Sequence, residues 1–191
     1  MRLHGFLSNI TTPVDLPALK HKVPGMLEDL RSDHAGEAGA VMIYRGILAG
    51  SRDPGVRRFA TDHLSTETAH LEIMEALLPR GARSLLLPLW RVAGWVTGFL
   101  PALAGSRAVY ATIAGVERFV VAHYEDQIRK LALDGTAGAL RATLVACQSD
   151  EAHHRDEAEA RGGQPLGAAL RLWTALVALG SRYAVIAARR L

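Results

Sequence analysis

The stretch Asp150-Glu151-Ala152-His153-His154 places a glutamate and a histidine three residues apart, at Glu151 and His154. On a helix, residues three or four apart lie on one face, so this spacing sets a carboxylate beside an imidazole. Glu67 and His70 repeat the spacing. Ten glutamates and eight histidines in 191 residues would give roughly 0.4 such pairs by chance. Two pairs therefore suggest a site, and two ordinary surface pairs are the alternative.

A lone glutamate precedes each pair at a similar distance. Glu37 comes 30 residues before Glu67, and Glu117 comes 34 residues before Glu151. Thirty-odd residues suit two antiparallel helices joined by a short loop, which returns the second residue to the level of the first. A glutamate from each of two helices and Glu-x-x-His from each of two others is the ligand pattern of a di-iron or di-manganese site in a four-helix bundle. The predicted metal ligands are Glu37, Glu67, His70, Glu117, Glu151 and His154.

Composition also favours an all-α fold. Alanine, leucine, arginine and glutamate abound, while β-branched and aromatic residues are sparse. The single cysteine, Cys147, excludes an internal disulfide and a Cys-x-x-Cys metal site. The net charge of +3 permits contact with an anionic membrane surface. No dense basic run is interleaved with aromatics, so we expect no nucleic-acid partner.

The helix boundaries follow from proline, glycine and capping residues. Residues 1–22 are expected to be irregular and to lack a secretory signal. Residues 23–191 are expected to form one domain. Asp53-Pro54 is typical of a helix start, with an N-cap followed by proline. The expected helices are about 24–48, 54–79, 106–133, 136–162 and 165–190, with a helical crossover at 84–104.

The crossover is the most apolar part of the chain. It is nearly 20 residues of low polarity, which is the length of a membrane span. However, Pro88, Arg91 and Pro101 interrupt it. A span here would also put the two halves of the metal site on opposite sides of a membrane. We therefore predict a crossover that runs along the bundle.

An exposed apolar face on this crossover would contact a membrane surface peripherally. We expect that contact through Leu85–Leu103, with Trp90, Trp95 and Phe99 broadly on one side of the helix. The alternative is a crossover that is simply packed on the bundle.

Two tyrosines follow the lone glutamates by two helical turns. Tyr44 is seven residues after Glu37, and Tyr124 is seven after Glu117, so each shares the face of its carboxylate. Each would hydrogen-bond beside the metals or act as a redox-active phenol. The alternative, an ordinary core tyrosine, is favoured for Tyr44.

Five further polar residues stand near the predicted ligands. Asp150 is expected to accept the outer N–H of a ligand histidine from a neighbouring helix. Asp33 and His34, about one turn before the first ligand, are candidates for the hydrogen bonds around the site. His123 and His153 lie off the glutamate faces, so we expect them to be exposed or structural.

These motifs together resemble the demethoxyubiquinone hydroxylases of ubiquinone biosynthesis. The resemblance runs from about residue 25 to the C-terminus and keeps the motif order. Arg118 departs from it where the family often has a second glutamate, and Asp150 replaces a glutamate of some members. The residues that carry it are Asp33-His34-Ala35-Gly36-Glu37-Ala38-Gly39-Ala40, Ile43-Tyr44, Glu67-x-x-His70-Leu71, Pro88-Leu89-Trp90, Val116-Glu117, His123-Tyr124, Gln127-Ile128-Arg129 and Glu151-x-x-His154.

The resemblance implies a ferritin-like four-helix bundle with a long helical crossover, an extra C-terminal helix and two irons per chain. Glu37 and His70 would serve one iron, and Glu117 and His154 the other. Glu67 and Glu151 would bridge them. The implied reaction is ring hydroxylation of a polyprenylated demethoxyubiquinol by dioxygen.

The implied setting is a peripheral membrane protein, on the cytoplasmic face of the cell membrane if the source is bacterial. A lipid-binding accessory protein or a second copy of the chain are candidate partners. The rival function is a ferritin-like iron-binding protein or ferroxidase. It would use the same ligands but would not need the apolar crossover.

Overall fold

The computed structural model describes residues 16–134, 137–163 and 167–191, and every regular element in these ranges is a helix. The all-α prediction is confirmed. The elements in order are α1 (Leu16–Lys22), α2 (Met26–Gly50), α3 (Pro54–Leu77), the short 3₁₀ helix η2 (Arg80–Ala82), α4 (Leu87–Ala104), α5 (Ser106–Asp134), α6 (Gly138–Gly162) and α7 (Ala168–Arg190).

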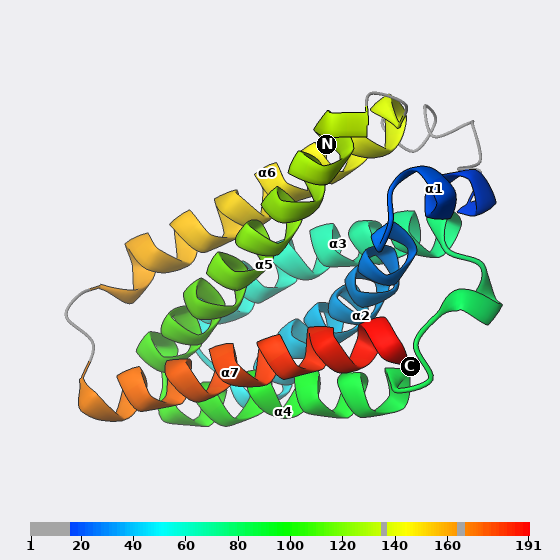
Figure 1. Ribbon diagram of the computed structural model, residues 1–191. Helices are drawn as coiled ribbons and strands as arrows, with labels where there is room; N and C mark the ends of the chain where they lie inside the picture. Colours follow the sequence, from blue (N-terminus) through cyan, green and yellow to red (C-terminus); the bar gives the residue numbers. More distant parts are fainter. Residues whose placement is uncertain (1–15, 135–136, 164–166) are drawn as a thin grey trace.

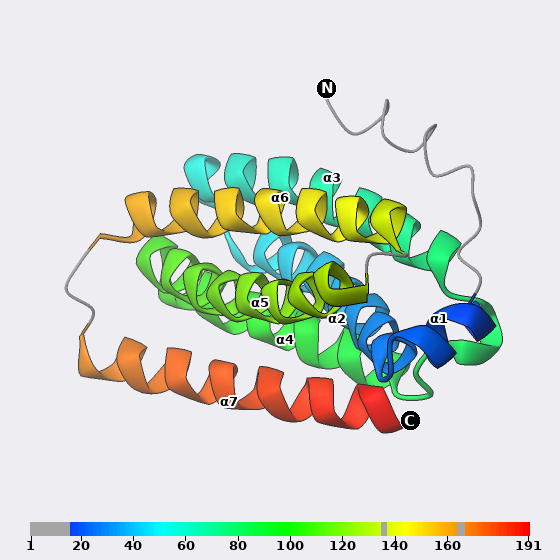
Figure 2. The same ribbon diagram turned by 45° about the horizontal axis from the view of Figure 1, so that its top comes forward.

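The long helices stack in three layers. Figure 2 shows α3 and α6 side by side on one outer face, α2, α5 and α4 in the middle of the view, and α7 on the opposite side, while Figure 1 shows α4 running near α7. The hairpins α2–α3 and α5–α6 are the two halves that the glutamate spacing predicted, and α4 connects them as the expected crossover. α7 is the extra C-terminal helix. It packs on α2 and α5.

Local sequence explains where the helices begin. Asp53 caps α3, because its Oδ1 accepts hydrogen bonds from the backbone N–H groups of Gly55 at 2.7 Å and Val56 at 3.0 Å. α2 begins two residues later than predicted, at Met26. Gly25 separates it from the preceding turn with a φ of 84°, in the left-handed region that favours glycine. The predicted first residues of the last two helices, Thr136 and Pro165, lie outside the described residues.

The prediction that residues 1–22 are irregular is wrong for part of that range. Residues 16–22 form α1, because Leu19 and the following Val23 bury their side chains in the core. Burial of such side chains favours order in a short segment. Residues 1–15 lie outside the described part of the chain. The assignment of 23–191 to one domain stays a prediction.

The crossover packs backbone to backbone on α2. A Cβ atom on Gly98 would meet the carbonyl oxygen of Ile43, and one on Gly94 would meet that of Gly39, both well inside van der Waals contact. Glycine is therefore required at these positions, because only a missing side chain allows two helices to come so close. This contact fixes which side of α4 faces the bundle.

The exposed face of α4 is aliphatic and not aromatic. Trp90, Trp95 and Phe99 are half-buried, and Trp95 stacks on Phe99 with ring centroids 4.5 Å apart. The expectation that these three rings form the outer face was wrong, because they flank the glycines that turn toward α2. Large exposed hydrophobic side chains instead include Leu85, Leu89, Val92, Val96, Leu100 and Leu103.

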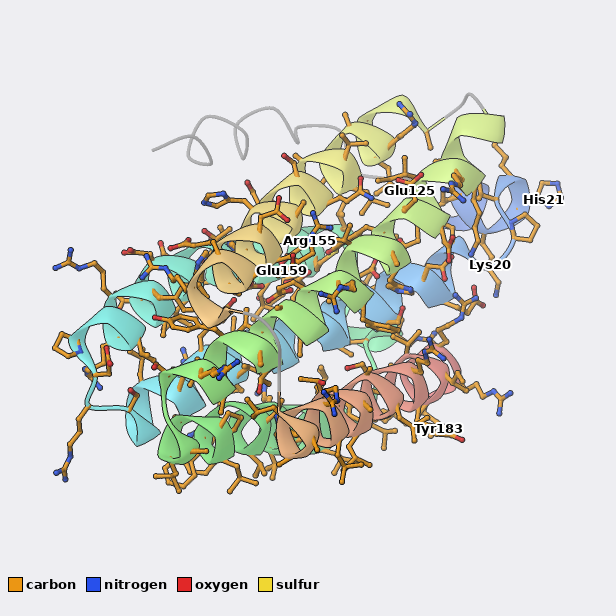
Figure 3. The ribbon with its side chains drawn as sticks, turned by 90° about the vertical axis from the view of Figure 1, so that its left-hand side faces the viewer. Lys20, His21, Glu125, Arg155, Glu159 and Tyr183 are labelled. Carbon is orange, nitrogen blue, oxygen red and sulfur yellow. The ribbon has the colours of Figure 1, made fainter. Side chains whose placement is uncertain are left out.

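α7 continues this apolar face. Within the described residues, every exposed large hydrophobic side chain except Val145 lies on or next to α4 or α7. Figure 3 shows Tyr183 of α7 pointing outward on the side opposite Arg155 and Glu159 of α6. In the same part of the chain, α7 is the one helix long and apolar enough to cross a membrane by length and composition. The members on α7 and at its end are Leu172, Leu176, Leu179, Tyr183, Ile186 and Leu191.

Candidate metal centre

The six predicted ligands meet in the middle of the bundle. On each helix they fall between two apolar clusters. One contains Met26, Ile73 and Leu144, and the other contains Phe59 and Ile113. These clusters hold the four helices in register and keep water away from the polar residues between them. All six ligand side chains are buried.

The six residues form two overlapping groups. One group is Glu37, Glu67, His70 and Glu151, and the other is Glu67, Glu117, Glu151 and His154. In each group the potential ligand atoms lie within 4.8 Å of one another. Glu67 and Glu151 belong to both groups, as bridging ligands would. The family resemblance implied this arrangement, and metal binding by these residues stays a prediction.

Both histidines turn the same nitrogen toward the carboxylates. His70 Nδ1 lies 2.8 Å from Glu151 Oε1. His154 Nδ1 lies 2.9 Å from Glu67 Oε1 and 3.3 Å from Glu151 Oε2. Each imidazole of one hairpin therefore reaches a carboxylate of the other, which ties the two halves together.

The electrostatics of the group fit bound cations. Burial, followed by the charge of Glu151, raises the pKa of Glu37 and of Glu117 well above the usual range. Burial alone would lower the pKa of His154, but Glu151 and Glu67 raise it to about 10. Bound protons thus supply the positive charge that the site needs. A buried carboxylate without a positive charge nearby is costly.

The donor set also fits two divalent ions. Both oxygens of buried Glu67 lack a hydrogen bond, because the close His154 ring is not aligned to donate one. Four carboxylates would balance the charge of two divalent ions with neutral imidazoles as the remaining ligands. Imidazole and carboxylate ligands suit ferrous iron. The residues present therefore can hold a two-metal centre.

The two tyrosines contact ligands across the bundle. The Tyr124 hydroxyl donates to Glu37 Oε1 at 2.6 Å, and the Tyr44 hydroxyl donates to Glu117 Oε1 at 3.2 Å. Each tyrosine thus bonds the lone glutamate of the other hairpin and not the one on its own helix. Periodicity gave the correct face for both but could not give the partner. Tyr44 is a fully buried core residue, as favoured, and its hydroxyl finds its partner in a predicted ligand.

The other polar residues that were predicted to lie near the ligands take different positions. Asp150 lies as predicted, with Oδ2 at 3.3 Å from His70 Nε2. His153 is exposed, as expected. Asp33 Oδ1 accepts a hydrogen bond from Gln127 Nε2 at 2.7 Å and lies 3.1 Å from His123 Nε2, away from the ligand atoms. His34 is buried, and its Nε2 lies 3.8 Å from Glu75 Oε1.

His63 was missed by the sequence reasoning. Its ring centroid lies 4.0 Å from that of His154, and its Nε2 lies 2.9 Å from Glu157 Oε2. Burial lowers the pKa of His63 to about 4. The available signal was its position four residues before Glu67, on the same face of α3. Arg118, the departure from the family pattern, points away from the centre and pairs with Glu159 on the surface.

A cavity of about 470 Å³ opens from the centre toward α4 and α7. Five of its wall residues belong to the centre: Glu37, Glu67, Glu117, Tyr124 and Glu151. The rest of the wall is mostly apolar and comes from α2, α4, α5 and α7. The wall residues that come from α4 and α7 include Trp90, Ala93, Thr97, Trp173, Val177, Gly180 and Ala184.

Comparison with known proteins agrees with this centre. The profile of the family described as ubiquinone biosynthesis protein COQ7 matches residues 26–188, which span all six predicted ligands. The chain belongs to the COQ7 family. This confirms the resemblance read from the sequence motifs.

Relatives of the COQ7 family carry hydroxylase names. A Rhodospirillum rubrum protein named 3-demethoxyubiquinol 3-hydroxylase is 40% identical over 141 residues, covering 71% of this chain and 64% of the relative. A Bordetella pertussis protein of the same name is 35% identical over 144 residues, covering 74% and 64%. A mitochondrial NADPH-dependent 3-demethoxyubiquinone 3-hydroxylase of Dictyostelium discoideum is 30% identical over 151 residues, covering 76% and 68%. The chain thus spans less than two thirds of the length of the first two relatives.

The contact between Asp150 and His70 leads to a prediction. Asp150→Asn weakens the acceptor for the outer nitrogen of His70, so we expect the affinity for divalent metal to fall by about tenfold. This is the lower end for such outer partners, because Asp150 is partly exposed. Competition with a chelator of known affinity measures this. Asp156→Asn, on the same helix but paired with Arg155, is the control. Equal affinities for both variants and the parent would contradict the role of Asp150.

Proposed function

We propose that this chain is a di-iron monooxygenase that hydroxylates the ring of a polyprenylated demethoxyubiquinol with dioxygen, as a 3-demethoxyubiquinol 3-hydroxylase. The observation that carries the proposal is the apolar cavity that ends on the paired carboxylate–histidine groups. The names of the COQ7 relatives support it. A ferroxidase would need the metal ligands but not this cavity.

The chain's own residues would prepare the site for that reaction. Two ferrous ions held by the six ligands would supply the electrons that activate dioxygen. Asp150 orients the His70 ring, and the hydroxyls of Tyr44 and Tyr124 hold the Glu117 and Glu37 carboxylates in place. The apolar cavity wall excludes water from the quinol ring.

The size and direction of the cavity suit a quinol with a long tail. Its volume of about 470 Å³ lies within the range of small-molecule sites, roughly 300–1,000 Å³. The ring would lie beside Glu37 and Glu117, while the tail would leave between α4 and α7. These two helices carry the exposed apolar side chains, so the tail would pass directly into lipid.

We further propose that the α4/α7 face binds the membrane surface peripherally. α7 lies on the bundle in this structure, because Arg31 Nη1 donates to Arg189 O at 3.3 Å and the Leu85 N–H donates to Leu191 O at 2.8 Å. Its inner face lines the cavity. A helix that is held at its end and covers a cavity is better placed to lie on a bilayer than to cross it. The cytoplasmic face is the expected side in a bacterium.

Product analysis tests the catalytic proposal. Protein loaded anaerobically with iron is mixed with a short-chain demethoxyubiquinol, a reductant and dioxygen. We expect about two irons per chain and a ring-hydroxylated product. Oxidation of ferrous iron with no organic product would instead support the ferroxidase.

The membrane proposal gives a separate prediction. The triple variant Val92→Ser, Leu100→Ser and Leu179→Ser removes apolar area from the α4/α7 face, which contributes roughly 25 cal/mol per Å² on contact with lipid. We expect weaker liposome binding and lower activity on a long-chain quinol. Iron content and activity on a tail-free quinol should stay near the parent values, because none of the three lines the cavity.

Val145→Ser provides the matched control. Val145 is exposed but lies on α6, in the layer opposite α4 and α7. It should leave liposome binding unchanged. If the triple variant lost activity equally on the long-chain and the tail-free quinol, the face would only stabilise the fold. The proposal that the quinol tail passes between α4 and α7 into lipid would then be wrong.

A further inference from the structure

A second group of metal-ligating side chains lies on the α3/α6 face, outside the buried centre. His63 Nε2 of α3 lies 2.9 Å from Glu157 Oε2 of α6. His153 Nε2, one turn earlier on α6, lies 3.9 Å from the same oxygen. The other oxygen of Glu157 accepts a hydrogen bond from Arg161 Nε at 2.9 Å. Oε2 is therefore left facing two imidazoles.

One of these distances already suits a shared divalent ion, and the second histidine must move to complete the set. Nitrogen and oxygen ligands bound at about 2.0–2.2 Å lie about 3 Å apart when they meet at a right angle. His63 Nε2 and Glu157 Oε2 already have this separation. The His153 side chain is 73% exposed, so it can rotate to bring its nitrogen closer. Two imidazoles and a carboxylate are a ligand set that ferrous iron accepts.

The group also connects solvent to the buried centre. His153 is at the surface, whereas His63 is only 4% exposed and its ring lies 4.0 Å, centroid to centroid, from that of His154. An ion bound between His63 and Glu157 would sit next to a ligand of the centre. The opposite approach, through the α4/α7 layer, is lined by apolar residues that would oppose the passage of a charged ion.

We propose that His63, His153 and Glu157 form a waypoint that takes a divalent iron ion from solvent and passes it to the buried centre. This inference rests on the proposed di-iron function. Ions would thus reach the centre through the polar α3/α6 face, and the quinol would reach it through the apolar α4/α7 face. A plain His63–Glu157 hydrogen bond would need no contribution from His153, so His153 distinguishes the two roles.

Calorimetric titration of the metal-free full chain with Zn²⁺ tests the site itself. We expect two tight ions at the centre and one weaker ion at the waypoint. His153→Ala and Glu157→Gln should each lose only the weaker ion. His21→Ala, which removes an exposed histidine on α1, should lose none. Absence of the weaker ion, or its persistence in both waypoint variants, would overturn the proposal. Absence of the tight ions alone would contradict the di-iron function instead.

Iron uptake tests the transfer. The metal-free protein is mixed anaerobically with ferrous iron, and the chelator-resistant iron is measured against time. His153→Ala should load about tenfold more slowly, the lower end of the rate gain from a site that concentrates ions locally, and should reach the same final content. A loading rate equal to that of the parent and of His21→Ala would show that ions reach the centre by another route.

Discussion

Glu151→Ala is expected to abolish most iron binding and most activity. Glu151 Oε1 lies 2.8 Å from His70 Nδ1 and Oε2 lies 3.3 Å from His154 Nδ1, so one side chain contributes to both metal-ligand groups. Its loss removes a ligand from each metal, leaves His70 without its nearest carboxylate, and leaves His154 with Glu67 alone. Bound iron should fall from about two to below one per chain. Turnover should fall by more than about 100-fold, the upper limit for losing an outer partner alone.

Iron analysis and single-turnover product analysis measure these effects. Glu159→Ala is the matched control, because Glu159 is a carboxylate on the same helix that pairs with Arg118 at the surface. It should keep both irons. Glu151→Gln keeps the shape of the side chain but not its charge, and should also lose iron. Full loading and turnover in Glu151→Ala would rule out the assigned centre.

Gly98→Ala is expected to lower stability although it adds a single methyl group. That methyl group would meet the Ile43 carbonyl oxygen and the Ile47 backbone nitrogen, neither of which can move without shifting α2. Overpacking of this kind typically costs about 1–3 kcal/mol. For a chain of this size, each kcal/mol lowers the melting temperature by about 2–4 °C. Thermal unfolding followed by circular dichroism measures the change.

Gly180→Ala is the matched control for this substitution. Gly180 also lies inside a helix, but nothing lies within 4 Å of the position that its Cβ atom would take. Alanine there should stabilise α7 by about 0.5–1 kcal/mol, since glycine disfavours helix. If both variants shifted stability by the same amount and sign, close backbone packing of α4 on α2 would be wrong.

Spacing along the chain predicted the centre because helix geometry converts spacing into position. A spacing of three from Glu to His, and of thirty-odd between the glutamates of a half, was enough to bring six residues together. Spacing could not predict which side chains contact each other between helices. The crossed bonds of Tyr44 and Tyr124 depend on how the two hairpins face each other, which no periodicity within one helix records.

The two outer helices were also hard to orient from sequence. α7 has two apolar sides, one that lines the cavity and one that is exposed, beside a side that carries arginines. In α4 the aromatic residues dominated the pattern, yet the glycines decided which side turned inward. His63 was missed because its partner Glu157 lies 94 residues away, on another helix.

The sharing of Glu67 and Glu151 between the two groups has a consequence for the amount of protein in the cell. Four buried acids face one another here, and the raised pKa values of Glu37 and Glu117 reflect the cost of charging them. Metal that binds only the folded chain relieves this cost, and stabilises the fold by about 2.7 kcal/mol when free metal is at 100 times the dissociation constant. Chains that lack metal would unfold more often and be degraded sooner. Under the proposed di-iron function, a cell short of iron would therefore contain less of this protein, and the surviving chains would be inactive.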